Sequence, residues 1–100
     1  MPDSVQLALF RLVQEGLTNA QRYGVGRASL RVERSPEAVD VTIENPVEGD
    51  AGPAAGSGYG LLGMRERVAA VGGTVEIGPT GDDRFRIAAH LPASRKETAR

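Results

Sequence analysis

Two helical stretches are each followed by two alternating stretches, and this order limits the folds open to the chain. Apolar residues recur with helical spacing through Ser4–Tyr23 and again through Leu61–Val71. The four alternating stretches are Ala28–Val32, Val39–Ile43, Thr74–Ile77 and Phe85–Leu91. Neighbouring strands of this kind form hairpins, whereas doubly wound parallel folds place single strands between helices. The order predicts an α/β two-layer sandwich, with a mixed, mostly antiparallel sheet covered by helices on one face.

Composition excludes several classes of function. The chain has 100 residues, no cysteine, one histidine (His90) and a formal net charge of −1. Disulfides, thiolate chemistry and paired-histidine metal sites are therefore excluded, and no global field attracts nucleic acid or an anionic membrane. No apolar run is long enough to span a bilayer. We expect residues 1–100 to form a single cytoplasmic domain, cut from a longer protein, without nucleic-acid or direct membrane partners.

A loop rich in small residues separates the two halves. Asn45–Tyr59 contains four Gly, two Pro and three Ala. Structureless loops of this length in a compact domain are usually functional or disordered. It leads through Gly56–Gly60 into the second helix, where glycines permit close backbone approach and the free N–H groups of a helix start attract anions. The pattern is typical of a phosphate site, and a flexible linker is the alternative.

Polar side chains at the border of the first helix form a second candidate site. Glu15 and Asn19 lie about 40° apart around the helix, at the edge of its apolar stripe. A carboxylate and an amide oxygen on successive turns can hold hydrated Mg²⁺, or the carboxylate can orient an attacking group. Arg22 lies on the same side and can reach a phosphate, while Tyr23 returns to the apolar face. A structural interpretation is the alternative: Glu15 and Asn19 would make ordinary hydrogen bonds on the helix surface. Arg22 would then be a solvated arginine and Tyr23 a core residue.

The two candidate sites together resemble a known family. FRLVQEGLTNAQRYG (Phe10–Gly24) precedes GSGYGLLGMRERVAAVGG (Gly56–Gly73) by about thirty residues. This combination resembles the catalytic ATP-binding domain of two-component sensor histidine kinases, which has the Bergerat, or GHKL, fold. The nearest likeness is to the nitrate-sensor and DesK-like branch, and it spans nearly the whole chain.

The resemblance implies roles for the helix residues. Asn19 would hold a Mg²⁺ ion that bridges the ATP phosphates, and Glu15 would assist phosphoryl transfer. Arg22 and Tyr23 match residues that touch the nucleotide.

It also implies roles for the loop. Gly58, Gly60 and the helix start at Leu61 match the glycine box that contacts the phosphates. The segment Gly49–Tyr59 would be the ATP lid, with Gly49 and Tyr59 among the nucleotide contacts.

Two positions depart from the family pattern. The family's aspartate accepts a hydrogen bond from the adenine amino group, and its position is held here by Pro46, which has no side-chain acceptor. Asn45, beside it, offers an amide oxygen as a substitute. Asp83 replaces a threonine of the last hairpin, and an acidic group near phosphates weakens their binding by repulsion.

The activity implied by the resemblance is transfer of the ATP γ-phosphoryl group to a histidine on a dimerisation domain that this chain lacks, for relay to a response regulator. Two alternatives keep the fold. One is a degenerate, non-catalytic module that binds nucleotide or docks protein. The other is a serine kinase of the anti-sigma-factor type, which needs no dimerisation helices.

Overall fold

The computed structural model describes residues 2–23, 26–47 and 58–93, with only the backbone at Tyr23 and at residues 58–60. Its elements are α1 (Asp3–Tyr23), β1 (Ser29–Arg34), β2 (Ala38–Pro46), α2 (Gly58–Ala70), β3 (Thr74–Pro79) and β4 (Arg84–Pro92). Their order is the predicted one. The largest differences from the predicted boundaries are that α2 already begins at Gly58 and that β2 continues to Pro46.

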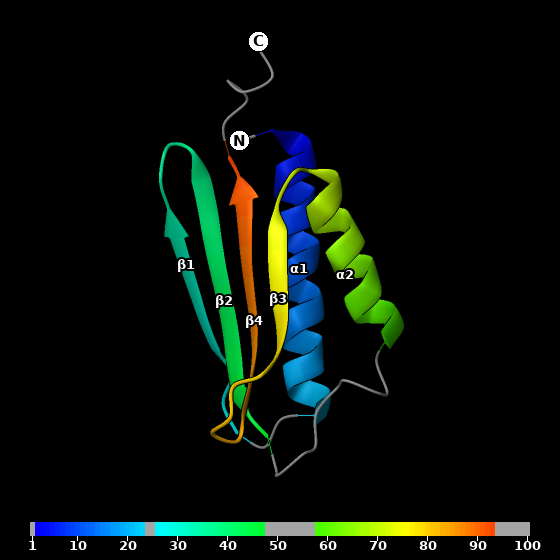
Figure 1. Ribbon diagram of the computed structural model, residues 1–100, viewed down its shortest axis with the longest axis vertical. Helices are drawn as coiled ribbons and strands as arrows, with labels where there is room; N and C mark the ends of the chain where they lie inside the picture. Colours follow the sequence, from blue (N-terminus) through cyan, green and yellow to red (C-terminus); the bar gives the residue numbers. More distant parts are fainter. Residues whose placement is uncertain (1, 24–25, 48–57, 94–100) are drawn as a thin grey trace.

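The four strands form one sheet in the order β1-β2-β4-β3, and each neighbouring pair is antiparallel. The long pairing between β2 and β4 explains why β2 extends beyond the alternating pattern of the sequence, which ends at Ile43. Asn45 and Pro46 continue the pairing opposite Phe85 and Arg84. Both helices lie on the same face of the sheet (Figure 1). The two-layer α/β sandwich is confirmed.

An aliphatic core fills the space between the two layers. Alternate residues of the central strands face the helices and are buried, as are residues at helical spacing on α1 and α2. The largest fully buried side chains are Leu12, Val39, Val41, Ile43, Met64, Val68, Ile87 and Leu91. The fully buried part of the core therefore comes from α1, α2, β2 and β4, and Val75 and Ile77 of β3 pack against it.

The helix layer does not cover β1. Leu30 and Val32 lie on the helix-facing side of this strand, yet they are 46% and 44% exposed. Phe10, on the neighbouring flank of α1, is also exposed. A pocket between this flank of α1 and the end of β1 is lined by Gln6, Leu9, Phe10, Val13 and Arg34.

Gly16 sets the distance between α1 and the sheet. A Cβ atom at this position would collide with Cδ1 of Ile43. Because glycine has no Cβ, the Ile43 side chain can pack directly against the helix backbone here. The residues that follow Gly16 on the helix are therefore held against the end of β2.

Gly73→Ala is expected to destabilise the fold by about 1–3 kcal/mol, the usual effect of overpacking. A Cβ on Gly73 would lie 2.5 Å from the backbone oxygen of His90 and 3.0 Å from Cγ1 of Val68. The matched control is Gly78→Ala, because a Cβ there meets nothing within 4 Å. Urea denaturation of both variants checks this, and equal losses of stability would contradict the steric account.

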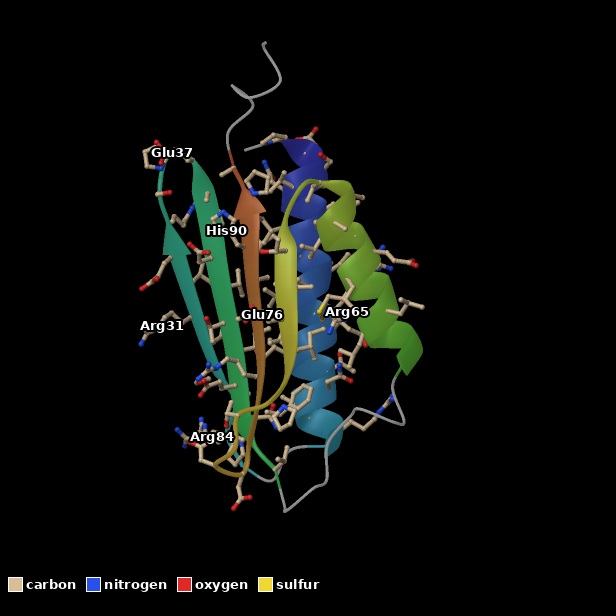
Figure 2. The ribbon with its side chains drawn as sticks, in the orientation of Figure 1. Arg31, Glu37, Arg65, Glu76, Arg84 and His90 are labelled. Atoms are coloured by element: carbon tan, nitrogen blue, oxygen red, sulfur yellow. The ribbon has the colours of Figure 1, made fainter. Side chains whose placement is uncertain are left out.

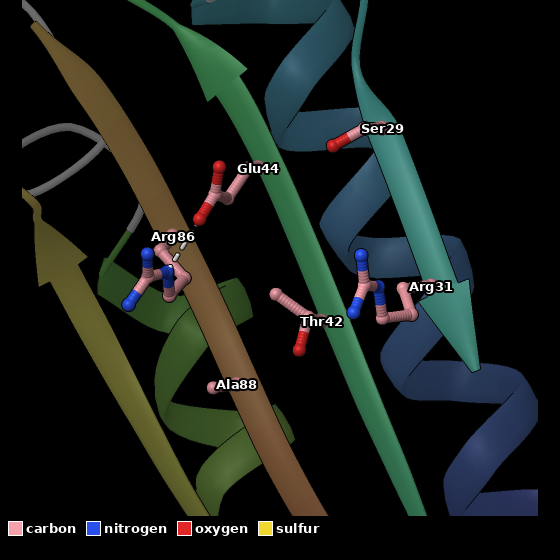
Figure 3. Close-up of a pocket in the computed structure, with 6 residues that line it drawn as sticks. All are labelled: Ser29, Arg31, Thr42, Glu44, Arg86 and Ala88. Atoms are coloured by element: carbon pink, nitrogen blue, oxygen red, sulfur yellow. Dashed lines mark hydrogen bonds and ion pairs between the residues drawn. The ribbon is translucent and has the colours of Figure 1, made fainter. Parts of the chain in front are cut away.

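The sheet face opposite the helices is polar. Figure 2 shows charged side chains on its strands, among them Arg31, Glu76 and His90. Glu44 accepts hydrogen bonds from Nε of Arg84, at 3.1 Å, and from Nε of Arg86, at 2.6 Å. A pocket on this face, drawn in Figure 3, is lined by Ser29, Arg31, Thr42, Glu44, Arg86 and Ala88. The ion pairs of Glu44 with Arg84 and Arg86 therefore link β2 to β4 on this face.

Glu44→Gln is expected to lower the free energy of unfolding at neutral pH by less than about 1 kcal/mol, because partly exposed ion pairs contribute little. The pKa of Glu44 lies below its usual value, chiefly because Arg86 hydrogen-bonds the carboxylate. A carboxyl group with a lowered folded-state pKa stabilises the fold above its unfolded-state pKa, and this stabilisation disappears as the pH falls through the folded-state pKa. Unfolding curves of wild type and variant should therefore converge in acid. A difference that is constant with pH would contradict the ion-pair account.

Candidate functional site

Two buried amides lie at the same end of the sandwich. α1 and β2 run in the same direction (Figure 1), and they touch where Gly16 meets Ile43. Asn19 follows Gly16 by one helical turn, and Asn45 follows Ile43 at the next helix-facing position of the strand. Their exposed fractions are 3% and 5%. They are the two buried polar residues of the described part of the chain, and both belong to the sequence-predicted site.

The Asn19 side chain lacks a hydrogen bond that burial normally requires. Among the described residues, its Nδ2 has no hydrogen-bond partner. A buried unsatisfied polar group costs about 1–3 kcal/mol, so each one in a native fold calls for an explanation. A leucine would fill the same space without this cost. Packing among the described residues therefore does not explain the residue type at this position.

Glu15 and Arg22 flank Asn19 on the same side of α1. Glu15 is half-buried one turn before Asn19, and Arg22 is exposed in the last turn of the helix. Within the described residues, no group of three His, Cys, Asp or Glu side chains is placed to hold a metal ion. A cation bound here would need further oxygen ligands from another molecule. Phosphate oxygens meet that requirement, since Mg²⁺ is commonly held by one or two protein oxygens together with phosphates.

The start of α2 offers backbone donors. The helix begins at Gly58, and its first turn, which includes Gly60, has no acidic residue to neutralise the positive end of the helix dipole. The side chain of Leu61 is buried and fixes this turn on the core. Tyr59 lies in the same turn. The loop residues before it, including the predicted contact Gly49, lie outside the described residues, as does most of the predicted lid.

Asn45, rather than Pro46, faces the helices. Alternate residues of β2 are buried up to Asn45, while Pro46 is half-buried and paired with Arg84 at the strand end. The prediction that Pro46 takes the place of the family's aspartate is therefore not supported by the strand's alternation. The alternation visible in the sequence ends at Ile43, so the sequence does not show which side of the strand Asn45 faces.

The hairpin between β3 and β4 anchors the end of β2. Val47 donates its backbone N–H to the carbonyl oxygen of Asp83, at 2.9 Å. Asp83 adopts a left-handed conformation, with φ of 63°, which aspartate tolerates better than most residues. Its carboxylate is exposed, and its backbone has a structural role that no residue pattern in the sequence could reveal.

Three curated relatives match most of the chain. The sensor histidine kinase LnrJ of Bacillus subtilis is 33% identical over 98 residues, which cover 97% of the chain. The histidine-protein kinase/phosphatases UhpB of Salmonella typhimurium and DegS of Brevibacillus brevis are 35% and 31% identical, over 87% and 96% of the chain. The chain belongs to the sensor histidine kinase family. It spans about a quarter or less of these sensor histidine kinases: 24% of LnrJ, 18% of UhpB and 25% of DegS.

A solved structure supports the fold of this histidine kinase segment. The histidine kinase AdeS of Acinetobacter baumannii superimposes with a TM-score of 0.68 at 19% identity, over 85% of this chain and 45% of that one. This likeness shows a common fold. No protein-family model matches the chain. Among the described residues, neither helix combines the length and apolarity needed to cross a membrane.

Proposed function

We propose that the chain is the ATP-binding catalytic domain of a cytoplasmic sensor kinase. It binds Mg-ATP and donates the γ-phosphoryl group to a histidine on a separate dimerisation domain, and a response regulator receives the group next. The observation that carries the proposal is the buried Asn19 amide, which has no hydrogen-bond partner for Nδ2 among the described residues. Sequence similarity to sensor histidine kinases over most of the chain supports it.

The binding site is built from the facing ends of α1 and α2. An amide offers both an acceptor and a donor, so Asn19 can bind Mg²⁺ through Oδ1 and a phosphate oxygen or metal-bound water through Nδ2. Backbone N–H groups of the first turn of α2 bind the phosphates without a basic side chain. Arg22 approaches the phosphates from the end of α1. The residues present therefore fit Mg-ATP.

Catalysis by this site depends on positioning. Phosphoryl transfer leaves little covalent chemistry to the protein, so alignment and electrostatic stabilisation carry the rate. Bound Mg²⁺ neutralises charge on the phosphates. Glu15 is half-buried next to Asn19, and its carboxylate can accept the N–H of an incoming imidazole. That hydrogen bond directs the other ring nitrogen at the γ-phosphoryl group and stabilises the positive charge that develops on the ring.

Calorimetric titration of the chain with ATP, in the presence of Mg²⁺ and again with excess chelator, tests the binding step. We expect saturable one-to-one binding that weakens about tenfold or more without the metal, because one metal bridge is worth about as much as a strong charged hydrogen bond. Absence of binding under both conditions would refute the proposed function. An ATP affinity that is the same with Mg²⁺ and with excess chelator would refute the role of the metal.

A further inference from the structure

The outer edge of β1 carries backbone groups that point away from the sheet. At the hairpin, Ser35 donates its backbone N–H to the carbonyl oxygen of Ala38, at 2.9 Å, so these two residues form a hydrogen-bonded pair. Hydrogen-bonded and non-hydrogen-bonded pairs alternate along an antiparallel ladder. The register continues unbroken through β1, so the N–H and C=O groups of Leu30, Val32 and Arg34 point away from β2. In the described part of the chain, no other strand pairs with them.

Apolar side chains are uncovered along the same edge. Leu30 and Val32 are half-exposed on the helix-facing side of β1. Phe10 and Leu17, two turns apart on α1, are 59% and 39% exposed. Phe10 also lines the pocket beside Arg34. A strand edge with outward-pointing backbone groups and an apolar side is a template for pairing with another strand, so the edge of β1 is a candidate interaction surface.

Two opposite charges on the outer face of β1 indicate which strand fits this edge. Arg31 and Glu33 are exposed there, on either side of Val32 in the sequence. If a second copy of β1 pairs antiparallel about Val32, the Arg31 of each copy lies directly opposite the Glu33 of the other. They meet at a non-hydrogen-bonded position, where opposing side chains are closest. The strand is therefore complementary to itself in charge.

Neighbouring registers of the same self-pairing are disfavoured. Sliding one strand by two residues is the smallest shift that again matches the outward-pointing backbone groups. A shift in one direction sets Arg31 opposite Arg31, and a shift in the other sets Glu33 opposite Glu33. Like charges directly opposite each other destabilise a sheet, whereas unlike charges stabilise it. The charge pattern therefore favours a single register, centred on Val32.

We propose that two copies of this chain associate through β1, which pairs antiparallel with itself about Val32 and joins the two four-stranded sheets into one. Val32 then packs against its counterpart at the centre, and the aliphatic stem of Arg34 covers Leu30 of the other copy. α2 lies toward the opposite edge of the sheet, beside β3 (Figure 1), so its first turn stays accessible. The association is therefore compatible with nucleotide binding and does not depend on it.

Sedimentation equilibrium of the wild-type chain at concentrations up to about 1 mM, the range of weak interfaces, tests the association. We expect a reversible equilibrium of monomer and dimer, because each strand contributes only six residues. A chain that stays monomeric would overturn the inference and would favour a strand from another part of a longer sensor kinase as the occupant of this edge. Open-ended oligomers would also overturn it, since a two-fold pairing closes after two copies.

Charge reversals then assign the dimer to β1. Arg31→Glu and Glu33→Arg should each weaken association about tenfold or more, because each variant sets like charges opposite each other twice. Glu76→Arg, at an exposed position of the other edge strand β3, is the matched control and should leave association unchanged. Circular dichroism checks that the variants fold. Folded reversal variants that dimerise as well as the wild type would overturn the inference.

An equimolar mixture of Arg31→Glu and Glu33→Arg separates contacts between copies from contacts within one copy. In the mixed pair, two glutamates of one copy lie opposite two arginines of the other, so association should return to within about threefold of the wild type. The ion pair between Arg31 and Glu33 inside one strand, at 3.8 Å, stays lost in both variants, so it cannot account for such a rescue. A mixture that associates no better than its components would overturn the inference.

Discussion

Asn19→Leu is expected to raise the melting temperature of the chain while it weakens Mg-ATP binding. The substitution removes a buried amide nitrogen that has no partner among the described residues and replaces it with apolar atoms of similar volume. Removing the unsatisfied group should stabilise the fold by about 1–3 kcal/mol, and each kcal/mol corresponds to about 4–8 °C in a domain of this size. Loss of a metal and phosphate ligand should lower the affinity about ten- to a hundredfold.

Thermal denaturation without nucleotide and calorimetry with Mg-ATP measure the two effects separately. Gln21→Leu is the matched control, because Gln21 is exposed on the same helix and neither quantity should change by a comparable amount. A higher melting temperature together with a lower Mg-ATP affinity would show that Asn19 serves ligand binding at a cost in stability. A destabilised Asn19→Leu that binds Mg-ATP normally would show that the amide has a structural role instead.

The elements of the fold could be predicted because each has a local pattern. α1 has a long apolar stripe, and β4 alternates buried Phe85, Ile87, Ala89 and Leu91 with outward-facing residues. Two boundaries could not be predicted. Asn45 and Pro46 are poor strand formers, yet both continue the ladder with β4, so tertiary pairing outweighed local preference. In the same way, Gly58 and Gly60 suggested a loop where α2 has already begun.

The candidate site, like the fold, could be predicted only where a local sequence pattern indicates it. Helical spacing placed Glu15 and Asn19 at the border of the apolar stripe, and Asn19 is indeed buried. Its missing hydrogen bond depends on what surrounds it in space, which no spacing rule describes. The assignment of Pro46 to the position of the family's aspartate stays a prediction; the alternation of β2 buries Asn45 on the helix-facing side and leaves Pro46 half-buried. The contact between Val47 and Asp83 is made by backbone atoms, so their side chains carry no signal of it.

Glu15→Gln is expected to leave Mg-ATP affinity within about threefold of the wild type and to slow phosphoryl transfer about a hundredfold or more, the range of a lost general acid–base group. The amide keeps the shape of the side chain but no longer provides the negative charge that orients and stabilises an attacking imidazole. Transfer can be measured in a chimera in which the chain replaces the matching segment of LnrJ, a sensor histidine kinase that is 33% identical to it. Radioactive γ-phosphate should appear in an acid-labile form, as phosphohistidine does.

Glu76→Gln is the matched control in that chimera, because Glu76 is exposed on β3 and should not alter the rate. The experiment also separates the alternatives that share this fold. A wild-type chimera that binds Mg-ATP and transfers nothing favours the degenerate module, whereas acid-stable label on serine favours a serine kinase. If the unsubstituted chimera forms phosphohistidine and Glu15→Gln matches its rate, the carboxylate does not orient the acceptor. Asn19 and the start of α2 would then account for catalysis through binding of the phosphates alone.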